Sequence, residues 1–153
     1  MPITQQDFLA TSIRNGAKDL LAAFLTLPEG KRDWSPGGTA RTAIDLVAEC
    51  ALSNGYTADV VETAKWSAPP YDEYLLVRSG LASQGLGAVE KLLVENTQRL
   101  VGVVESVPDE EMCVEIETAF GVMSKAHLVA YPYWNMSYHE GQIYYIASIV
   151  SGH

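Results

Sequence analysis

The chain has 153 residues, a length that suits one domain, residues 1–153, with a hydrophobic core of its own. Ten basic residues, which are scattered, stand against 19 acidic ones and give a net charge of −9, so we expect no nucleic-acid partner. The two cysteines form no CxxC pair, which argues against a disulfide framework or a zinc knuckle. Without a leader-like start or an apolar run of about 18 residues, we expect a cytoplasmic protein with no membrane segment.

Two helices are predicted in the first half of the chain. From Thr4 to Leu27, apolar residues recur at steps of three and four, the spacing of a helix face that packs against other helices. The segment PEGKRDWSPGG ends this helix, because proline and glycine are turn residues. Thr39 is the expected N-cap of a second helix, which continues to about Val61. One of its two candidate inward faces carries Glu49.

The second half predicts a short helix, two long ones and an extended segment. After the break KWSAPPYDEY, a short helix is expected over about Tyr71 to Ser79. Leu86 to Val107 shows a heptad seam interrupted by Asn96, which predicts the third long helix. The acidic segment SVPDEEMCVEIETAFG favours a short extended segment or an irregular loop. Ser124 is expected to cap a last helix that runs to about Val150.

These elements predict an all-α protein. Four amphipathic helices of about 20 residues, with a short extra helix and an extended segment before the last helix, favour a four-helix bundle. The long connections leave room for a non-sequential up and down order. Pro132 lies inside the last helix, and because it lacks an N–H it should kink or locally open that helix.

The inward stripe of the last helix carries three polar residues, Asn135, His139 and Gln142. Asn135 and His139 are four residues apart, so they project from adjacent turns of one face and can hold one ion or ligand between helices. A core histidine that simply bonds a neighbouring polar group is the commoner case. So many polar residues nevertheless favour a site, because each buried polar group without a partner costs about 1–3 kcal/mol. Tyr138, beside His139, either packs in the core or lines a pocket.

The motif WNMSYHEGQIYYI, residues 134–146, resembles the closing-helix signature of the DinB/YfiT-like superfamily, in which two histidines separated by three residues precede a Gly-Gln-Ile step. The segment TAIDLVAECALSN, residues 42–54, is similar to the second-helix segment of that family, where a third histidine is typical. The resemblance spans most of the chain. It implies a four-helix bundle in up-down-down-up order, usually dimeric, with a divalent metal held by three histidines near one end. Some members transfer low-molecular-weight thiols such as bacillithiol or mycothiol, or isomerise substrates with the help of a thiol.

Position by position, the three histidines of the family fall on Glu49, Asn135 and His139. One imidazole with a carboxylate and a neutral amide binds Zn²⁺ or Ni²⁺ more weakly than three imidazoles do, and it suits Mg²⁺ or Mn²⁺ only if water completes the site. We therefore predict no tightly bound metal, with a divalent ion such as Zn, Ni or Mn as the alternative. A hydrogen-bonded pair of Glu49 and His139, supported by Asn135 and Gln142, could replace the ion.

Three functions stay open from the sequence, and no catalytic residue is assigned. A small-molecule-binding or activity-depleted protein would use Glu49, Asn135, Tyr138, His139 and Gln142 as its pocket. A divalent-metal-dependent thiol transferase would use Glu49, Asn135, His139 and water, with a low-molecular-weight thiol as cosubstrate. The third is a non-catalytic dimeric scaffold, since aromatic residues on the last helix favour a homodimer.

Overall fold

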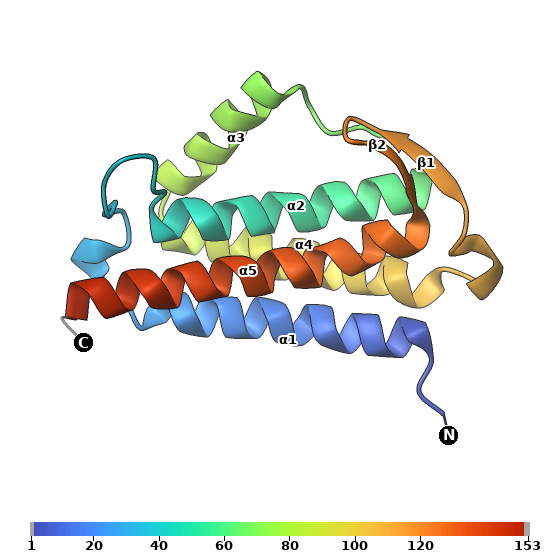
Figure 1. Ribbon diagram of the computed structural model, residues 1–153, viewed down its shortest axis with the longest axis horizontal. Helices are drawn as coiled ribbons and strands as arrows, with labels where there is room; N and C mark the ends of the chain where they lie inside the picture. Colours follow the sequence, from blue (N-terminus) through green and yellow to red (C-terminus); the bar gives the residue numbers. More distant parts are fainter. Residues whose placement is uncertain (1, 152–153) are drawn as a thin grey trace.

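The computed structural model describes residues 2–151, and four long helices within them pack as a bundle (Figure 1). These helices are α1 (Gln5–Leu25), α2 (Ala43–Thr63), α4 (Leu86–Ser106) and α5 (Lys125–Ser151). In Figure 1, α1 and α5 run in one direction while α2 and α4 run in the opposite one. Both α1 and α2 pack mainly against α4 and α5. The predicted all-α bundle with up-down-down-up order is confirmed.

A shorter helix and a hairpin lie outside the four-helix core. Helix α3 (Tyr71–Ser83) packs mainly on α2, and its first turns rise away from the bundle (Figure 1). Strand β1 (Glu115–Thr118) pairs antiparallel with β2 (Gly121–Ser124). The predicted short helix and extended segment are confirmed, and the helix is four residues longer than expected because it continues to Ser83. The pairing strand β2 was not predicted, because GVMS is short, contains glycine and shows no alternation.

The start of α2 differs from the prediction. Thr42, and not Thr39, is the N-cap, and its hydroxyl accepts a hydrogen bond from the N–H of Asp45 at 3.3 Å. Thr39 instead lies in a turn closed by the bond from the Ala40 N–H to the Gly37 carbonyl, 3.1 Å long. A turn residue cannot cap a helix that begins four residues later.

Helix α5 begins as predicted and continues past its proline. The N–H of His127 donates to the Ser124 hydroxyl at 3.2 Å, so Ser124 does cap the helix. Helix α5 is continuous from Lys125 to Ser151, so Pro132 does not divide it, and the predicted alternative of a kink at Pro132 stays a prediction. The Pro132 side chain is buried among the helices, where packing holds it in place.

Apolar side chains from all four long helices fill the centre of the bundle, and the predicted seam of α4 is confirmed at its fully buried positions. The largest side chains of this core are Ile13, Leu20, Phe24, Leu93, Leu100, Met136 and Ile143. Over residues 2–151, the structure contains no helix that is both long and apolar enough to span a membrane.

Candidate functional site

The polar residues predicted on α2 and α5 meet between these two helices. Nε2 of His139 lies 2.9 Å from Oε1 of Glu49, and Nδ1 of His139 lies 2.6 Å from Oε1 of Gln142. A carboxylate only accepts hydrogen bonds, so Nε2 of His139 donates to Glu49, while the direction of the Nδ1 contact with Gln142 depends on the tautomer of the ring. The side chain of His139 is 6% exposed. The predicted Glu49–His139 pair is therefore present, and it joins α2 to α5 from inside the bundle.

Two arginines hold the opposite side of Glu49. Arg41, just before the N-cap of α2, donates to Oε2 of Glu49 and also to the carboxylate of Asp45. Arg78 of α3 donates from Nε to Oδ1 of Asp45 at 2.9 Å, and its Nη1 lies 3.8 Å from Oε2 of Glu49. Asp45 and Glu49 are four residues apart on one face of α2, so this face holds α3 through charge. We refer to Arg41, Asp45, Glu49, Arg78 and His139 as the charged cluster.

The charge of Glu49 shapes its surroundings. Burial alone would raise the pKa of Glu49, but the hydrogen bonds and charges of His139 and Arg41 outweigh burial and lower this pKa to about 2. The carboxylate is therefore ionised at neutral pH. Burial, followed by the charge of Glu49, raises the pKa of Tyr74 to about 12, and the same two causes raise the pKa of Tyr131. Both hydroxyls stay protonated and can donate hydrogen bonds.

The remaining predicted site residues lie nearby but bond elsewhere. Asn135 is buried, yet its Oδ1 accepts from the Tyr131 hydroxyl at 3.3 Å and its Nδ2 points to Sγ of Cys50 at 3.7 Å. Tyr138 is 54% exposed, and its ring meets the His139 ring edge-on with centroids 5.4 Å apart. Burial raises the pKa of the Cys50 thiol, which makes it a packing residue and not a nucleophile.

Sequence analysis missed Arg41, Asp45 and Arg78. One signal was available, because Asp45 and Glu49 place two carboxylates on one helix face, and such a face needs nearby cations when it is covered. Arg78 had no comparable signal. Its role depends on how α3 docks on α2, which the local pattern of α3 does not encode.

The residues present do not fit a divalent metal ion. Both oxygens of Glu49 already bond to protein groups, and the Asn135 oxygen accepts from Tyr131. The guanidinium groups of Arg41 and Arg78 place positive charge beside the carboxylate, where it would repel a cation. In the part of the chain that the structure describes, no three His, Cys, Asp or Glu side chains are grouped to hold a metal.

A row of exposed aromatic rings lies on α5 beside the charged cluster. The rings of Trp134 and Tyr138 are stacked, with centroids 5.4 Å apart and planes at 20°, and Tyr131 lies 5.7 Å from Trp134 on the other side. Trp134 is 57% exposed. We refer to Tyr131, Trp134 and Tyr138 as the aromatic row. It gives the site a large apolar surface that solvent can reach.

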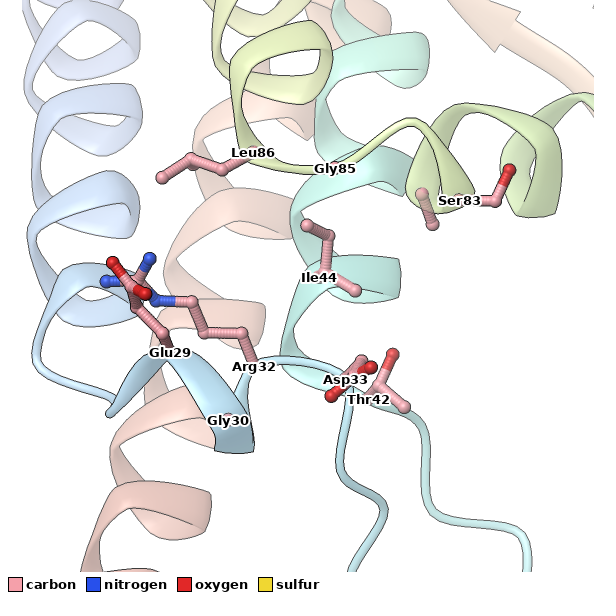
Figure 2. Close-up of a pocket in the computed structure, with 10 residues that line it drawn as sticks. Glu29, Gly30, Arg32, Asp33, Thr42, Ile44, Ser83, Gly85 and Leu86 are labelled. Carbon is pink, nitrogen blue, oxygen red and sulfur yellow. The ribbon is translucent and has the colours of Figure 1, made fainter.

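A cavity of about 670 Å³ lies where α2 and α4 begin (Figure 2). Its apolar lining includes Ile44 and Leu86, and Arg32 stands at its edge, where it donates to the Leu27 carbonyl and packs over the Phe24 ring. None of the predicted site residues lines this cavity. The groups with distinctive chemistry therefore gather at the charged cluster and not at this cavity.

No protein-family model matches the chain, and no curated protein sequence matches it either. Solved structures do. A DinB-like protein of Bacillus subtilis is 17% identical, with a TM-score of 0.69 over 95% of this chain and 92% of that one. The chain has the DinB-like fold. YfiT from Bacillus subtilis, described as a probable metal-dependent hydrolase with an unusual four-helix bundle topology, is 15% identical, with a TM-score of 0.77 over 99% of this chain and 90% of that one.

A third structure with this DinB-like fold is a mycothiol-dependent maleylpyruvate isomerase. It is 12% identical, with a TM-score of 0.75 over 92% of this chain, and the match covers 61% of the isomerase. At such identities the likeness extends to the fold and not to the activity. The function of this DinB-like bundle must therefore be argued from its own residues.

Proposed function

We propose that this DinB-like bundle works without a bound metal and binds a small molecule beside the charged cluster. The supporting observation is that both oxygens of Glu49 are occupied, one by His139 and the other by Arg41. The His139 ring and the Arg41 guanidinium donate to the two oxygens that an ion would otherwise bind, and the guanidinium supplies positive charge. They leave Glu49 no free oxygen for coordination, so the position is filled by protein groups.

Binding of a small molecule is supported by partial exposure at the edge of the cluster. The side chains of Arg41, Glu49 and Arg78 are 29%, 17% and 16% exposed, so solvent reaches this edge although His139 behind it is nearly sealed. The aromatic row adds apolar surface next to His139, which bonds Glu49. Convergent polar groups next to an aromatic surface are the usual composition of a ligand site.

A divalent-metal-dependent thiol transferase has less support. That reaction needs an ion with an open position for a thiolate. Here Glu49, Asn135 and His139 already bond to other protein groups, and the buried Cys50 supplies no thiolate of its own. The geometry assigns no catalytic residue. A dimeric scaffold remains a prediction, which sedimentation of the full chain would test.

Metal analysis of protein purified without an affinity tag tests the first half of the proposal. We expect no stoichiometric Zn, Ni or Mn, and no rise in Tm when these ions are added. As a positive control, the triple variant Arg41→Ser, Glu49→His, Asn135→His places three imidazoles at the site and removes one cation. We expect its Tm to rise with Zn²⁺ or Ni²⁺. A stoichiometric metal in the unchanged protein would contradict the proposal.

Fragment binding tests the second half. A library of small soluble compounds is added to isotope-labelled protein, and backbone amide NMR shifts locate each binder on the bundle. We expect binders to shift residues of the charged cluster and of the aromatic row together. If all binders map to other surfaces, such as the cavity of Figure 2, small-molecule binding at the charged cluster is wrong.

A further inference from the structure

We propose that the ligand of this site is a carboxylate carried on a planar ring, with the carboxylate held by Arg78 and the ring placed against the aromatic row. This inference rests on the proposed function and adds the chemical class of the ligand. It follows from the donors of Arg78, from the contacts that fix the Arg78 side chain, and from the contacts that link Arg78 through Glu49 and His139 to the aromatic row.

Arg78 has donors that its protein partners do not use. Its Nε bonds Asp45, but Nη1 lies 3.8 Å from the nearest oxygen of Glu49, which is beyond hydrogen-bond distance. Among residues 2–151, the one sealed side-chain polar atom without a partner is Oδ1 of Asn54. The terminal nitrogens of Arg78 are therefore not sealed. The Tyr74 hydroxyl also bonds this guanidinium, and the terminal N–H groups that it does not use face the partly exposed edge of the cluster.

That edge is already held in one orientation. Asp45 binds Nε of Arg78 at 2.9 Å, and the guanidinium lies over the Tyr74 ring, 5.7 Å from its centroid. The Arg78 side chain is 16% exposed, so it loses little freedom when a ligand binds. A planar guanidinium with two free N–H groups matches the two oxygens of one carboxylate. We therefore assign the charged end of the ligand to Arg78.

The aromatic row lies a short chain of contacts away. Arg78 is next to Glu49, Glu49 bonds His139, and the His139 ring meets Tyr138, which stacks on Trp134. Trp134 and Tyr138 are both more than half exposed, so the parts of these rings that do not stack on each other are available to another ring. An aliphatic carboxylate would use only the charged end of this surface, and a neutral arene only the aromatic end. A ring that carries a carboxylate uses both.

Benzoate is the probe. Benzamide keeps the ring and the shape without the charge, acetate keeps the carboxylate without the ring, and phenyl phosphate carries a larger charge. Each is titrated into isotope-labelled full-length protein while the indole N–H signal of Trp134 and the Nε–H signal of Arg78 are followed by NMR. We expect saturable shifts of both signals with benzoate, and binding at least about tenfold weaker for the other three probes.

Variants test the assigned contacts. Arg78→Lys keeps the charge that pairs with Asp45 but removes the fork, and we expect it to weaken benzoate binding at least about tenfold. Trp134→Ala, at an exposed position, should weaken binding several-fold without loss of folding. Arg99→Lys is the matched control, because Arg99 also joins two helices through two carboxylates, those of Asp59 and Glu62, and should leave binding unchanged.

The outcomes separate this inference from the proposed function. If benzoate at about 10 mM shifts neither signal, or if benzamide or phenyl phosphate binds as well as benzoate, the ligand class is wrong. The proposed function survives that result when the protein is metal-free and other fragments map to the charged cluster. A stoichiometric metal would contradict the proposed function whatever benzoate does. Unchanged benzoate binding in Arg78→Lys would also overturn the inference.

Discussion

Two polar regions inside the bundle differ in how completely their hydrogen bonds are satisfied. In the charged cluster, both oxygens of Glu49 and both ring nitrogens of His139 have partners. Further along α2, Asn54 is fully buried and donates to Thr97 at 3.0 Å, but its Oδ1 has no partner. An unpaired amide oxygen costs about 1–3 kcal/mol, whereas a buried charge without its partner costs more. The Glu49–His139 pair at the centre of the charged cluster must therefore be complete, while the neutral region can remain incomplete.

The neutral region also includes a close approach of two helices. Gly55 of α2 lies against Asn96 of α4, whose Nδ2 donates to the Ala51 carbonyl at 2.8 Å. We refer to Asn54, Gly55, Asn96 and Thr97 as the neutral layer. If the comparison is right, breaking the charged cluster should cost several times more than changing the neutral layer.

The largest expected effect comes from removing one partner of the charged pair. Glu49→Ala and His139→Ala should each lower the free energy of unfolding by about 3–5 kcal/mol, because each breaks the buried bond between the two side chains and leaves the remaining polar group without that partner. For a chain of this size, each kcal/mol of lost stability lowers Tm by roughly 2–4 °C. Urea denaturation measures the effect. As a control, Lys91→Ala in the exposed Lys91–Glu95 pair should change stability by less than about 0.5 kcal/mol.

The double variant Glu49→Leu, His139→Leu shows whether the effect is due to pairing. Because it removes both members of the pair, it should lose clearly less than the sum of the losses measured for the single variants Glu49→Leu and His139→Leu. Additive losses would mean that Glu49 and His139 contribute independently, and the charged cluster would then be no more cooperative than the neutral layer.

A smaller effect is expected from acid. The pKa of Glu49 is about 2 in the folded protein, and that of an ordinary Glu in an unfolded chain is about 4.3. The unfolded state therefore binds more protons in this range, so the stabilisation is fully present above about pH 5 and is lost as pH falls toward 2. The contribution of ionised Glu49 to the free energy of unfolding should be on the order of 2 kcal/mol. Urea denaturation between about pH 6 and pH 3 measures the loss.

Two variants assign this acid loss to Glu49. Glu49→Gln cannot titrate, so its stability should fall less between the same pH values. Glu105→Gln changes an exposed carboxylate that pairs with Arg14, and it should keep the pH profile of the unchanged protein. An identical acid slope in Glu49→Gln and the unchanged protein would rule out a depressed pKa at Glu49.

Much of the fold could be predicted from spacing alone. The heptad seam of α4 identifies a buried face, and Val89, Leu93 and Leu100 do lie in the core. The pairing of Glu49 with His139 was also predicted, because polar residues on the inward stripes of two packed helices must find partners. These successes share one cause, since helical periodicity reports which side chains face the core.

The rest depended on contacts that no local pattern records. Arg78 is 33 residues from Asp45 in sequence, and the two meet only because α3 turns back over α2. Asn135 lies on the expected face of α5, but its oxygen accepts a hydrogen bond from the hydroxyl of Tyr131, one turn earlier in the same helix. The shift of the α2 N-cap from Thr39 to Thr42 depended on a turn that competes for the same segment.

Within the neutral layer, Gly55→Ala should cost about 1–2 kcal/mol. A Cβ at position 55 would lie 2.6 Å from Nδ2 of Asn96 and 2.9 Å from its Cγ, so the Asn96 side chain must move and lose its bond to the Ala51 carbonyl. Thermal and urea unfolding measure the loss. Adding Asn96→Ala should recover part of it, because the clash then disappears.

Gly102 provides a control of opposite sign for this helix contact. It lies inside α4, it is exposed, and an added Cβ would meet nothing within 4 Å. Gly102→Ala should therefore stabilise the protein by about 0.5–1 kcal/mol, the intrinsic advantage of alanine in a helix. If both glycine variants were stabilising, the contact between Gly55 and Asn96 would not constrain the packing of α2 on α4.

A double variant with a small expected net effect is the most direct test of the comparison. Thr97→Val alone removes the main partner of the Asn54 amide and should cost about 1–3 kcal/mol. Adding Asn54→Leu removes the stranded amide together with its unpaired oxygen, so urea denaturation of the double variant should give a stability within about 1 kcal/mol of the unchanged protein. The corresponding leucine pair at Glu49 and His139 cannot be equally neutral, because it removes one of the two carboxylates that Arg41 holds and leaves only Asp45. Equal losses of stability in the two double variants would mean that the charged cluster depends on its pairing no more than the neutral layer does.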